Sequence, residues 1–472
     1  MQSFSMLING EEIGDSLSTI QVMNPATGEQ IATVPNGGAK EAVLAVDAAY
    51  DAFKDWSALS AYDRSSLLNK WHELIEIHME DLARTMTEEQ GKPLAEARGE
   101  IKYANGFISW YAEEAKRIYG EMIPSSQTGK RIFIHKQPVG VTAVITPWNF
   151  PAAMITRKVG PALAAGCTVV IKPAEQTPIT AIRLAQLALE AGIPAGVINV
   201  VTGDASAIGE AWLKDTRVRK LTFTGSTEVG KLLMREAADT VKKISLELGG
   251  HAPAIVMEDC DIEKAVDGVI AAKFRNAGQT CVCANRIYVQ ETIAEDFTAK
   301  FVDRVKRLKV GNGMDENVSI GPLIDEDAIT KVQSHVEDAQ SKGAKIAVGG
   351  ARKQGLFYEP TVLFDVKDNM VCMQEETFGP VAPITTFSSI EEVLRRANDS
   401  IYGLAAYVFT ENISRGIRMS EQLEYGIVGL NDGLPSTPQA PFGGFKQSGL
   451  GREGGHHGLD EYIEIKYISV GL

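Results

Sequence analysis

Three short segments supply the side chains that a thiol-dependent oxidation of an aldehyde would require. Cys281 lies in Gly278-Gln-Thr-Cys281, Asn149 in Trp148-Asn-Phe-Pro151, and Glu247 in Glu247-Leu-Gly-Gly250. A cysteine can add to an aldehyde carbonyl, an amide can stabilise the oxyanion, and a carboxylate can activate water against the resulting thioester. Taken singly, the three would be interpreted as a buried thiol, a turn residue and a strand-end charge. Their joint presence favours the catalytic interpretation.

The elements that must position these residues form two α/β series. Near-continuous apolar strands separated by helices are typical of a parallel sheet covered on both faces. The first series predicts a Rossmann-like dinucleotide-binding unit, and the second predicts a separate catalytic domain. The strands of the first series are expected at 141–146, 168–172, 197–202 and 220–224, and those of the second at 254–257, 286–290, 345–348 and 426–430.

Capping residues and helix breakers mark the expected helix boundaries. Residues 38–118 are mainly amphipathic helix, with Asp63 expected to cap a helix over 64–79 and a break at Gly91-Lys-Pro93. Thr177 is the expected N-cap of a second helix, which has Pro178 in its first turn and stops at Gly192. We expect the helices of 38–118 to pack beside the nucleotide-binding sheet.

Two further strands, expected at 130–136 and 462–470, lie outside both series. A terminal strand with one apolar face exposes an edge that another sheet must cover. We therefore expect pairing with a partner subunit, in a homodimer or a homotetramer; an edge strand within the chain is the alternative. The predicted domains are a coenzyme-binding domain at 1–123 and 142–247, a catalytic domain at 248–440, and oligomerisation strands at 124–141 and 455–472.

Composition narrows the class of protein. The 472 residues are 44% hydrophobic and 23% charged, as in a globular enzyme of two or three domains, and the net charge of −14 argues against nucleic-acid binding. The five cysteines form no disulfide framework, and the N-terminus shows neither a signal peptide nor a membrane span. A cytoplasmic location is expected. The seven histidines lack metal-ligand spacing, so no metal site is predicted.

A glycine-rich turn, Gly225-Ser-Thr-Glu-Val-Gly-Lys231, comes within one residue of the phosphate-binding loop of nucleotide triphosphatases. Position 232 is Leu, so the hydroxyl that would ligand Mg²⁺ is missing. A glycine turn that leads into a helix N-terminus still suits a dinucleotide pyrophosphate. We therefore interpret the segment as part of a dinucleotide site.

In combination, the motifs strongly resemble those of the aldehyde dehydrogenase superfamily over almost the whole chain. The resemblance implies an α/β fold with a Rossmann-like coenzyme domain, an α/β catalytic domain and a small β oligomerisation element. It also implies that Cys281 is the nucleophile, that Asn149 and the backbone N–H of Cys281 form the oxyanion hole, and that Glu247 is the general base. The matching segments, in order, are Trp148–Pro151, Phe223–Ser226, Glu247–Gly250, Gly278–Cys281, Glu376–Pro380 and Pro441–Gly444.

The same resemblance implies a set of cofactor-binding residues. Lys172 and Glu175 would meet the adenosine ribose, and Glu376 and Phe378 the nicotinamide ribose and ring. A carboxylate at Glu175 can accept from the ribose hydroxyls but would repel a 2′-phosphate, so NAD is favoured; Lys172 could offset the phosphate, so NADP stays possible. The remaining cofactor-binding positions are Trp148 and Ser226, at the pyrophosphate, with Gly225, Gly230 and Leu248.

Within the superfamily, the segments 156–158, 275–283 and 446–454 are most similar to succinate-semialdehyde dehydrogenases. This similarity implies NAD(P)-dependent oxidation of succinate semialdehyde to succinate, as in GABA degradation, with Arg157, Arg275 and Ser436 binding the substrate carboxylate. Taken alone, either arginine would more often be a surface charge or part of a structural ion pair.

Several alternatives remain open from the sequence. The two prolines of 434–440 would reshape the mouth of the pocket, so glutarate or 2-oxoglutarate semialdehyde stays a credible substrate. A thiol esterase or acyltransferase could use the same residues without a nicotinamide. Cys283 resembles the redox partner that can mask the catalytic thiol in some relatives, although residues i and i+2 of an extended strand lie at the edge of disulfide geometry.

Overall fold

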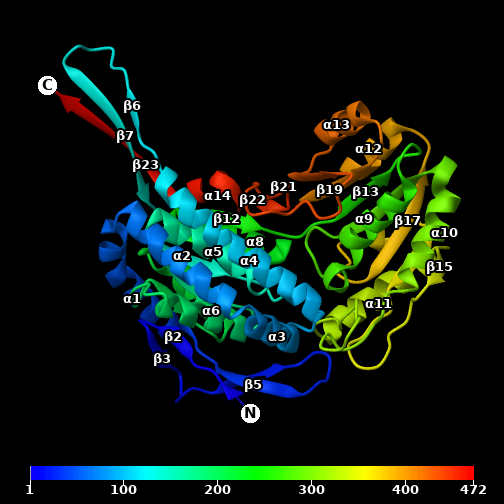
Figure 1. Cartoon of the computed structure of the whole chain (residues 1–472), viewed down its shortest axis with the longest axis horizontal. Coiled ribbons are helices and arrows are strands. Elements are labelled where there is room, and N and C mark those ends of the chain that lie inside the picture. The colour runs from blue at the N-terminus through cyan, green and yellow to red at the C-terminus, as the bar shows by residue number, and fades with distance from the viewer. Residues whose placement is uncertain (1) are drawn as a thin grey trace.

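The computed structural model describes residues 2–472 and contains two large sheets, each flanked by helices, and a small sheet that projects from one end (Figure 1). The first large sheet has eight strands, of which the five central ones run parallel. In spatial order they are β22 (Gly449–Leu450), β12 (Lys243–Glu247), β11 (Val218–Thr224), β8 (Val141–Ile145), β9 (Thr168–Lys172), β10 (Ile198–Val200), β2 (Met6–Ile8) and β3 (Glu11–Ile13).

The order of the parallel strands determines where a ligand can bind. Chain order reverses between β8 and β11, and in sheets of this type the crevice outside the carboxyl ends of the strands at such a point is the binding site. The helices linking the strands are α5 (Ala153–Ala165), α6 (Pro178–Glu190), α7 (Ala205–Lys214) and α8 (Thr227–Ala237). The helices packed beside them are α1 (Ala39–Ala58), α2 (Ala61–Ile77), α3 (Met79–Gln90) and α4 (Leu94–Glu114).

Of two predicted helix caps, Asp63 is not the cap residue, and Thr177 is the cap residue but makes no side-chain capping bond. The hydroxyl of Ser60, not the side chain of Asp63, accepts from a backbone N–H at the start of α2, because the helix begins three residues earlier than expected. Thr177 occupies the predicted cap position of α6, yet its hydroxyl makes no capping bond. The buried Glu89 of α3 accepts from the N–H groups of Ile179 and Thr180 instead, at 2.8 and 2.9 Å.

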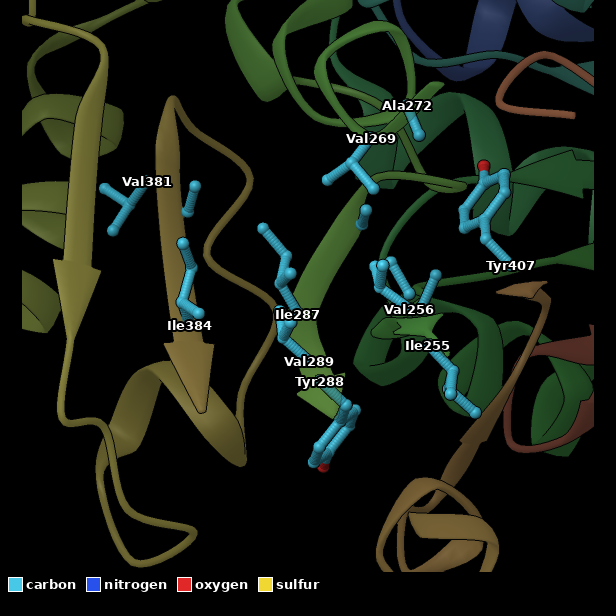
Figure 2. Packing of buried hydrophobic residues seen from close by; sticks show 14 of the residues in the cluster. Ile255, Val256, Val269, Ala272, Ile287, Tyr288, Val289, Val381, Ile384 and Tyr407 are labelled. Carbon is cyan, nitrogen blue, oxygen red and sulfur yellow. The ribbon is translucent and has the colours of Figure 1, made fainter. Parts of the chain in front are cut away.

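The second large sheet has seven strands and its own apolar core (Figure 2). Ile255 and Val256 of β13 belong to one buried cluster with Val289 of the central strand, β14, and Val269 of α9, all at 0% exposure. The strands, in spatial order, are β15 (Lys345–Val348), β16 (Thr361–Phe364), β17 (Val381–Phe387), β14 (Ala284–Gln290), β13 (Ala252–Val256), β19 (Ala405–Phe409) and β20 (Ile427–Leu430). The helices are α9 (Ile262–Phe274), α10 (Ala294–Val305), α11 (Glu326–Ser341), α12 (Ile390–Asn398) and α13 (Ile413–Gln422).

The two strands expected outside both series pair with each other. β23 (Ile463–Gly471) runs antiparallel to β7 (Lys130–Pro138), and β6 (Glu121–Ile123) covers the other edge of β7. This three-stranded sheet extends away from the body, with the C-terminus at its tip (Figure 1). Met122, Ile465 and Tyr467 are 59–70% exposed on it.

The remaining elements are two small sheets and a short helix. β1 (Gln2–Ser3), β4 (Thr19–Met23) and β5 (Gln30–Pro35) form a sheet near the N-terminus, β18 (Tyr402–Gly403) pairs with β21 (Phe445–Lys446), and α14 (Gly455–Asp460) precedes β23. Within residues 2–472, no helix combines the length and the apolar character needed to cross a membrane.

Candidate active site

Two cavities meet at Cys281, between the two large sheets. One, of about 240 Å³, is here called the Arg275 cavity, and the other, of about 350 Å³, the Trp148 cavity; Cys281 lines both. The Arg275 cavity is lined chiefly by Lys92, Glu96, Glu100, Tyr103, Phe150, Met154, Arg157, Arg275, Cys281, Ser436 and Phe442. The Trp148 cavity is lined chiefly by Trp148, Asn149, Gly225, Ser226, Leu248, Gly249, Cys281, Asp327, Lys331, Glu376 and Phe378.

The loop that carries Cys281 is held in an unusual backbone conformation. Asn276 and Ala277 have φ values of 51° and 56°, in the left-handed region that non-glycine residues rarely adopt. Gly250 permits the close approach of this loop to the end of β12, because a Cβ there would lie 2.1 Å from the carbonyl oxygen of Cys281. Tight packing therefore fixes the thiol where the two cavities meet.

The pKa of the Cys281 thiol lies above its usual range. Burial raises its pKa to about 12, with Arg157 and Arg275 acting in the opposite direction and Glu247 and Glu376 adding to the rise. A base must therefore remove the proton as the sulfur attacks a carbonyl.

Asn149 is fixed by its own backbone. Its carbonyl oxygen accepts from Lys92 Nζ at 2.8 Å and from Asn276 Nδ2 at 3.0 Å, and its side-chain nitrogen donates to the carbonyl of Gln279 at 3.1 Å. An amide nitrogen has two N–H groups, so one is left for a ligand in the Trp148 cavity beside Cys281. This arrangement suits stabilisation of an oxyanion.

Glu247 ends β12, and neither of its carboxyl oxygens has a hydrogen-bond partner within residues 2–472. Burial raises its pKa to about 8, helped by the nearby Glu453, whereas Arg157 and Lys158 lower it. A carboxyl with its pKa near the working pH is suited to general-base catalysis.

A buried charged network lies behind Glu247. Helix α5 is buried along its whole length, so the charged groups of Arg157 and Lys158 require partners. Both pair with the carboxylate of Glu453, and Lys158 Nζ also donates to the hydroxyl of Thr224 at 2.6 Å. Arg157 Nη2 is 3.9 Å from Glu247 Oε2.

Arg275 and Ser436, both predicted to bind the substrate carboxylate, are half-buried in the wall of the Arg275 cavity. The guanidinium of Arg275 lies 5.2 Å from the ring centre of Phe150. Within residues 2–472, no carboxylate lies within 4.0 Å of it. Arg275 is therefore available to an anionic group in the cavity.

The Trp148 cavity has an aromatic wall and a helix N-terminus. The rings of Trp148 and Phe378 meet edge to face, with 5.6 Å between centres, and Phe378 has a φ of 53°. Ser226 caps α8 by accepting from the N–H of Val229 at 3.3 Å, so the positive end of this helix is near the cavity. A flat ring and a pyrophosphate could be accommodated here.

Three other predicted cofactor residues are placed around this cavity. Glu376 accepts from the N–H of Gly250 at 3.1 Å, and burial raises the pKa of its carboxyl to about 7. Leu248 lines the cavity, and Gly230 of α8 packs against it so closely that a Cβ would lie 2.3 Å from Leu248 Cδ2. Gly230 thus contributes to the cavity by allowing α8 to pack closely against Leu248.

Lys172 and Glu175 lie at the carboxyl end of β9, outside the walls of both cavities. They form an ion pair with each other, and burial lowers the pKa of the Lys172 ammonium. The carboxylate of Glu175 is 39% exposed. A ribose could therefore reach Glu175 from solvent, and the residues present fit a bound dinucleotide.

Cys283 is not in an extended strand, contrary to the sequence-based expectation. Its N–H donates to the carbonyl of Thr280 in a turn, and β14 begins only at Ala284. The thiol is buried, 3.2 Å from Lys273 Nζ, and all five cysteines are free.

Several residues of the site lie outside the motifs that predicted it. Lys92, in the segment interpreted only as a helix break, pairs with Glu100 in the wall of the Arg275 cavity. Lys158 and Glu453 lie in the segments 156–158 and 446–454, which stand out in the sequence only by their similarity to succinate-semialdehyde dehydrogenases. The only sequence signal for these residues is a charged side chain within an apolar segment, as with Arg157 and Lys158 in the segment that forms α5. Within residues 2–472, no three His, Cys, Asp or Glu side chains are grouped as metal ligands.

Comparison with known proteins identifies the class. The model of the aldehyde dehydrogenase family matches residues 13–468, and the chain belongs to that family. The predicted fold and family are therefore confirmed.

Individual relatives are similar over nearly their full lengths. The chain is 55% identical to the succinate-semialdehyde dehydrogenase [NADP(+)] GabD of Escherichia coli (strain K12), over 99% of this chain and 97% of the relative. It is 56% identical to a glutarate-semialdehyde dehydrogenase of Pseudomonas putida, over 98% and 97%. The crystal structure of succinate-semialdehyde dehydrogenase from Burkholderia pseudomallei superposes with a TM-score of 0.98 at 53% identity, covering 99% of this chain and 98% of that one.

Proposed function

We propose that this enzyme oxidises succinate semialdehyde to succinate with NAD or NADP. The observation that carries the proposal is the position of Cys281 between a cavity with an available cation, Arg275, and a cavity suited to a nicotinamide. A semialdehyde can then present its carbonyl to the thiol while its carboxylate lies at Arg157, Arg275 and Ser436, which line the same cavity. The names of the similar proteins support the same substrate class.

The residues account for the steps of the reaction. Cys281 adds to the aldehyde as its thiol proton passes to water, and the oxyanion is held by Asn149 and the N–H of Cys281. A nicotinamide bound in the Trp148 cavity would supply the hydride acceptor. The thioester left on Cys281 is then hydrolysed by a water from which Glu247 removes a proton.

The cofactor would be held by the residues around the Trp148 cavity. Trp148 and Ser226 would contact the pyrophosphate at the N-terminus of α8, beside Gly225, and Glu376 and Phe378 would contact the nicotinamide half. These assignments agree with the placement of the side chains at the reversal point of the parallel sheet.

We further propose that NAD is preferred to NADP. The charge of Lys172 is already paired with Glu175. A 2′-phosphate would therefore be repelled by the Glu175 carboxylate, and Lys172 would not neutralise it. The name of the E. coli relative specifies NADP, which makes this a point for direct measurement. We expect Glu175→Gln to raise kcat/KM for NADP relative to NAD by about tenfold or more; an unchanged ratio would exclude Glu175 as the selector.

The substrate assignment is tested by following cofactor reduction with succinate semialdehyde, glutarate semialdehyde, 2-oxoglutarate semialdehyde and uncharged butanal. We expect succinate semialdehyde to have the highest kcat/KM, by about 100-fold over butanal. Equal rates with butanal would refute carboxylate recognition, and a higher rate with a longer semialdehyde would identify that compound as the substrate. Ester hydrolysis faster than aldehyde oxidation would favour the thiol esterase alternative.

The burst of reduced cofactor tests the role of Glu247. Glu247→Gln should form one equivalent of reduced cofactor per site and then turn over about 100-fold more slowly than the wild type, because hydrolysis of the thioester lacks its base. A variant without a burst would show that Glu247 is required before hydride transfer.

We propose that the chain has a coenzyme-binding domain (1–123 and 142–247), a catalytic domain (248–440) and oligomerisation strands (124–141 and 455–472). The exposed apolar side chains of β6 and β23 support assembly into a homodimer or homotetramer. Light scattering of the wild type and of Ile465→Glu would test this assembly. The five free cysteines support a reducing, cytoplasmic location.

A disulfide between Cys281 and Cys283 stays a hypothesis about regulation. Because Cys283 is buried against Lys273, the turn that joins the two thiols would have to rearrange. Peroxide should inactivate the wild type reversibly by dithiothreitol. If Cys283→Ala is inactivated and recovers in the same way, the hypothesis is wrong.

A further inference from the structure

The two proposed donors of the oxyanion hole come from different parts of the chain. Asn149 follows β8 of the first large sheet, and Cys281 precedes β14 of the second. Their relative position therefore depends on contacts between the two parts as well as on each loop. A donor stabilises an oxyanion only from within hydrogen-bond distance, and a misplacement of about 1 Å can cost about 100-fold in rate.

Asn276 lies between the two loops and is hydrogen-bonded to both. Its side chain is buried, and its Nδ2 donates to the carbonyl oxygen of Asn149 at 3.0 Å and to that of Gln279 at 3.3 Å. Gln279 stands two residues before Cys281. The N–H of Asn276 donates to the carboxylate of Glu96 at 2.8 Å. One side-chain amide thus joins the segment of Asn149 to the segment of Cys281.

The orientation of this amide is determined by a third element. Gln90, the last residue of α3, is fully buried, and its Oε1 accepts from the backbone N–H of Lys92 at 3.0 Å. A backbone N–H can only donate, so Gln90 presents its oxygen to Lys92 and its Nε2 to Asn276, whose Oδ1 accepts at 3.0 Å. Because Oδ1 faces that donor, Nδ2 of Asn276 faces the carbonyl of Asn149.

Two properties of asparagine suit position 276. Asparagine tolerates the φ of 51° better than most residues, and its short amide donates and accepts at the same time. Glycine would keep this backbone conformation and lose both kinds of side-chain bond. The effect of the amide can therefore be separated from that of the backbone by substitution.

From this geometry we propose that Gln90 and Asn276, here called the amide relay, are positioning residues that set the place of the Asn149 amide relative to Cys281. Neither residue lines the Arg275 cavity or the Trp148 cavity, so the relay acts through Asn149 and not by contact with the substrate. The proposal rests on the proposed role of Asn149 in the oxyanion hole. It does not depend on which aldehyde is oxidised.

The test measures two rates in the full-length enzyme with NAD. One is the formation of reduced cofactor in the first turnover of succinate semialdehyde and of butanal, and the other is the alkylation of Cys281 by iodoacetamide, followed by mass spectrometry. Only the first needs the oxyanion donors. We expect Asn276→Gly to lower the first-turnover rate with both aldehydes by about tenfold or more, and the alkylation rate by less than about threefold.

A double-mutant cycle with Asn149→Ala shows whether Asn276 acts through the Asn149 amide. In the Asn149→Ala enzyme the amide that the relay positions is already gone. Adding Asn276→Gly should therefore slow the first turnover by less than about twofold further.

A second variant keeps the test decisive if Asn276→Gly does not fold. Gln90→Met retains the length of the side chain but removes the donor to Asn276, and it should lower the first-turnover rate by about threefold or more without changing alkylation. The matched control is Gln333→Met. It removes an amide that bonds the hydroxyl of Tyr358 at 3.0 Å outside both cavities, and it should leave both rates unchanged.

The proposal is overturned if Asn276→Gly and Gln90→Met keep the wild-type first-turnover rate, or if they slow alkylation as strongly as hydride transfer. It is also overturned if the effects of Asn276→Gly and Asn149→Ala multiply in the double variant. A wild-type rate in Asn149→Ala would refute the proposed oxyanion hole itself. A slow Asn149→Ala enzyme with unaffected relay variants would refute the relay alone.

Discussion

The two cavities that share Cys281 are built differently. The walls of the Arg275 cavity come largely from helices α4 and α5, and its buried charges are paired, Lys92 with Glu100 and Arg157 with Glu453. The walls of the Trp148 cavity come largely from loops after β8, β11 and β12. Its charged residues Asp327, Lys331 and Glu376 form no ion pair within 4.0 Å in residues 2–472.

The difference indicates a division between a rigid and an adaptable half of the site. Buried ion pairs hold their side chains in one geometry, since breaking one costs several kcal/mol. Loops without such pairs can move at lower cost. Under the proposed function, the aldehyde would thus be bound in a preorganised cavity, and the cofactor in one whose loops would let the reduced nicotinamide withdraw before hydrolysis.

The largest expected effect comes from removing the residue that the two cavities share. Cys281→Ala should lower turnover by more than about 10⁴-fold, because no other thiol can reach the carbonyl. Binding of NAD, measured by quenching of tryptophan fluorescence, should be retained, since the loops of the Trp148 cavity are intact. Loss of NAD binding together with turnover would show that the two halves are not separable.

Removing a lysine should destabilise the protein more at the Arg275 cavity than at the Trp148 cavity. Lys92→Met leaves the buried carboxylate of Glu100 without its cation and should cost roughly 3–5 kcal/mol, whereas exposed Lys331 can be replaced by Met with little change. Thermal unfolding of both variants measures this. Equal midpoints would contradict the contrast between a rigid and an adaptable half.

Asn149 connects the two halves, since Lys92 holds its carbonyl while its amide lines the Trp148 cavity. Asn149→Ala should lower the rate of hydride transfer by about 10²–10³-fold. Hydride transfer should then become the slowest step, so reduced cofactor should form without a burst. Reduced cofactor forming at the wild-type rate would argue against Asn149 as part of the oxyanion hole.

The smallest expected effects are those of pH. The proposed role of Glu247 as base requires its ionised form, so kcat should rise about tenfold per pH unit below a midpoint near 8 and level off above it. Cofactor binding should tighten above pH 7, where Glu376 becomes ionised and can accept from ribose hydroxyls. If kcat and cofactor affinity changed with the same pH midpoint, Glu247 and Glu376 would not titrate independently.

Local patterns predicted most of the fold, because strands and helices are marked by periodicity and breakers. Cys281, Asn149 and Glu247 could be singled out because each stands in a short segment of its own. The sequence did not show that Arg157 pairs with Glu453, almost 300 positions away. Nor did it show that Glu89, not Thr177, satisfies the first N–H groups of α6. Such contacts depend on tertiary packing, which leaves no local signal.

A thiol that forms part of two cavity walls can be approached from two directions. An alkylating reagent reaches it through either opening, so a carboxylate ligand alone shields one path and the dinucleotide alone shields the other. The fold reduction in the alkylation rate with both ligands bound should exceed the product of the reductions measured with each ligand alone. The rate of alkylation therefore reports which openings are occupied, even in the absence of turnover.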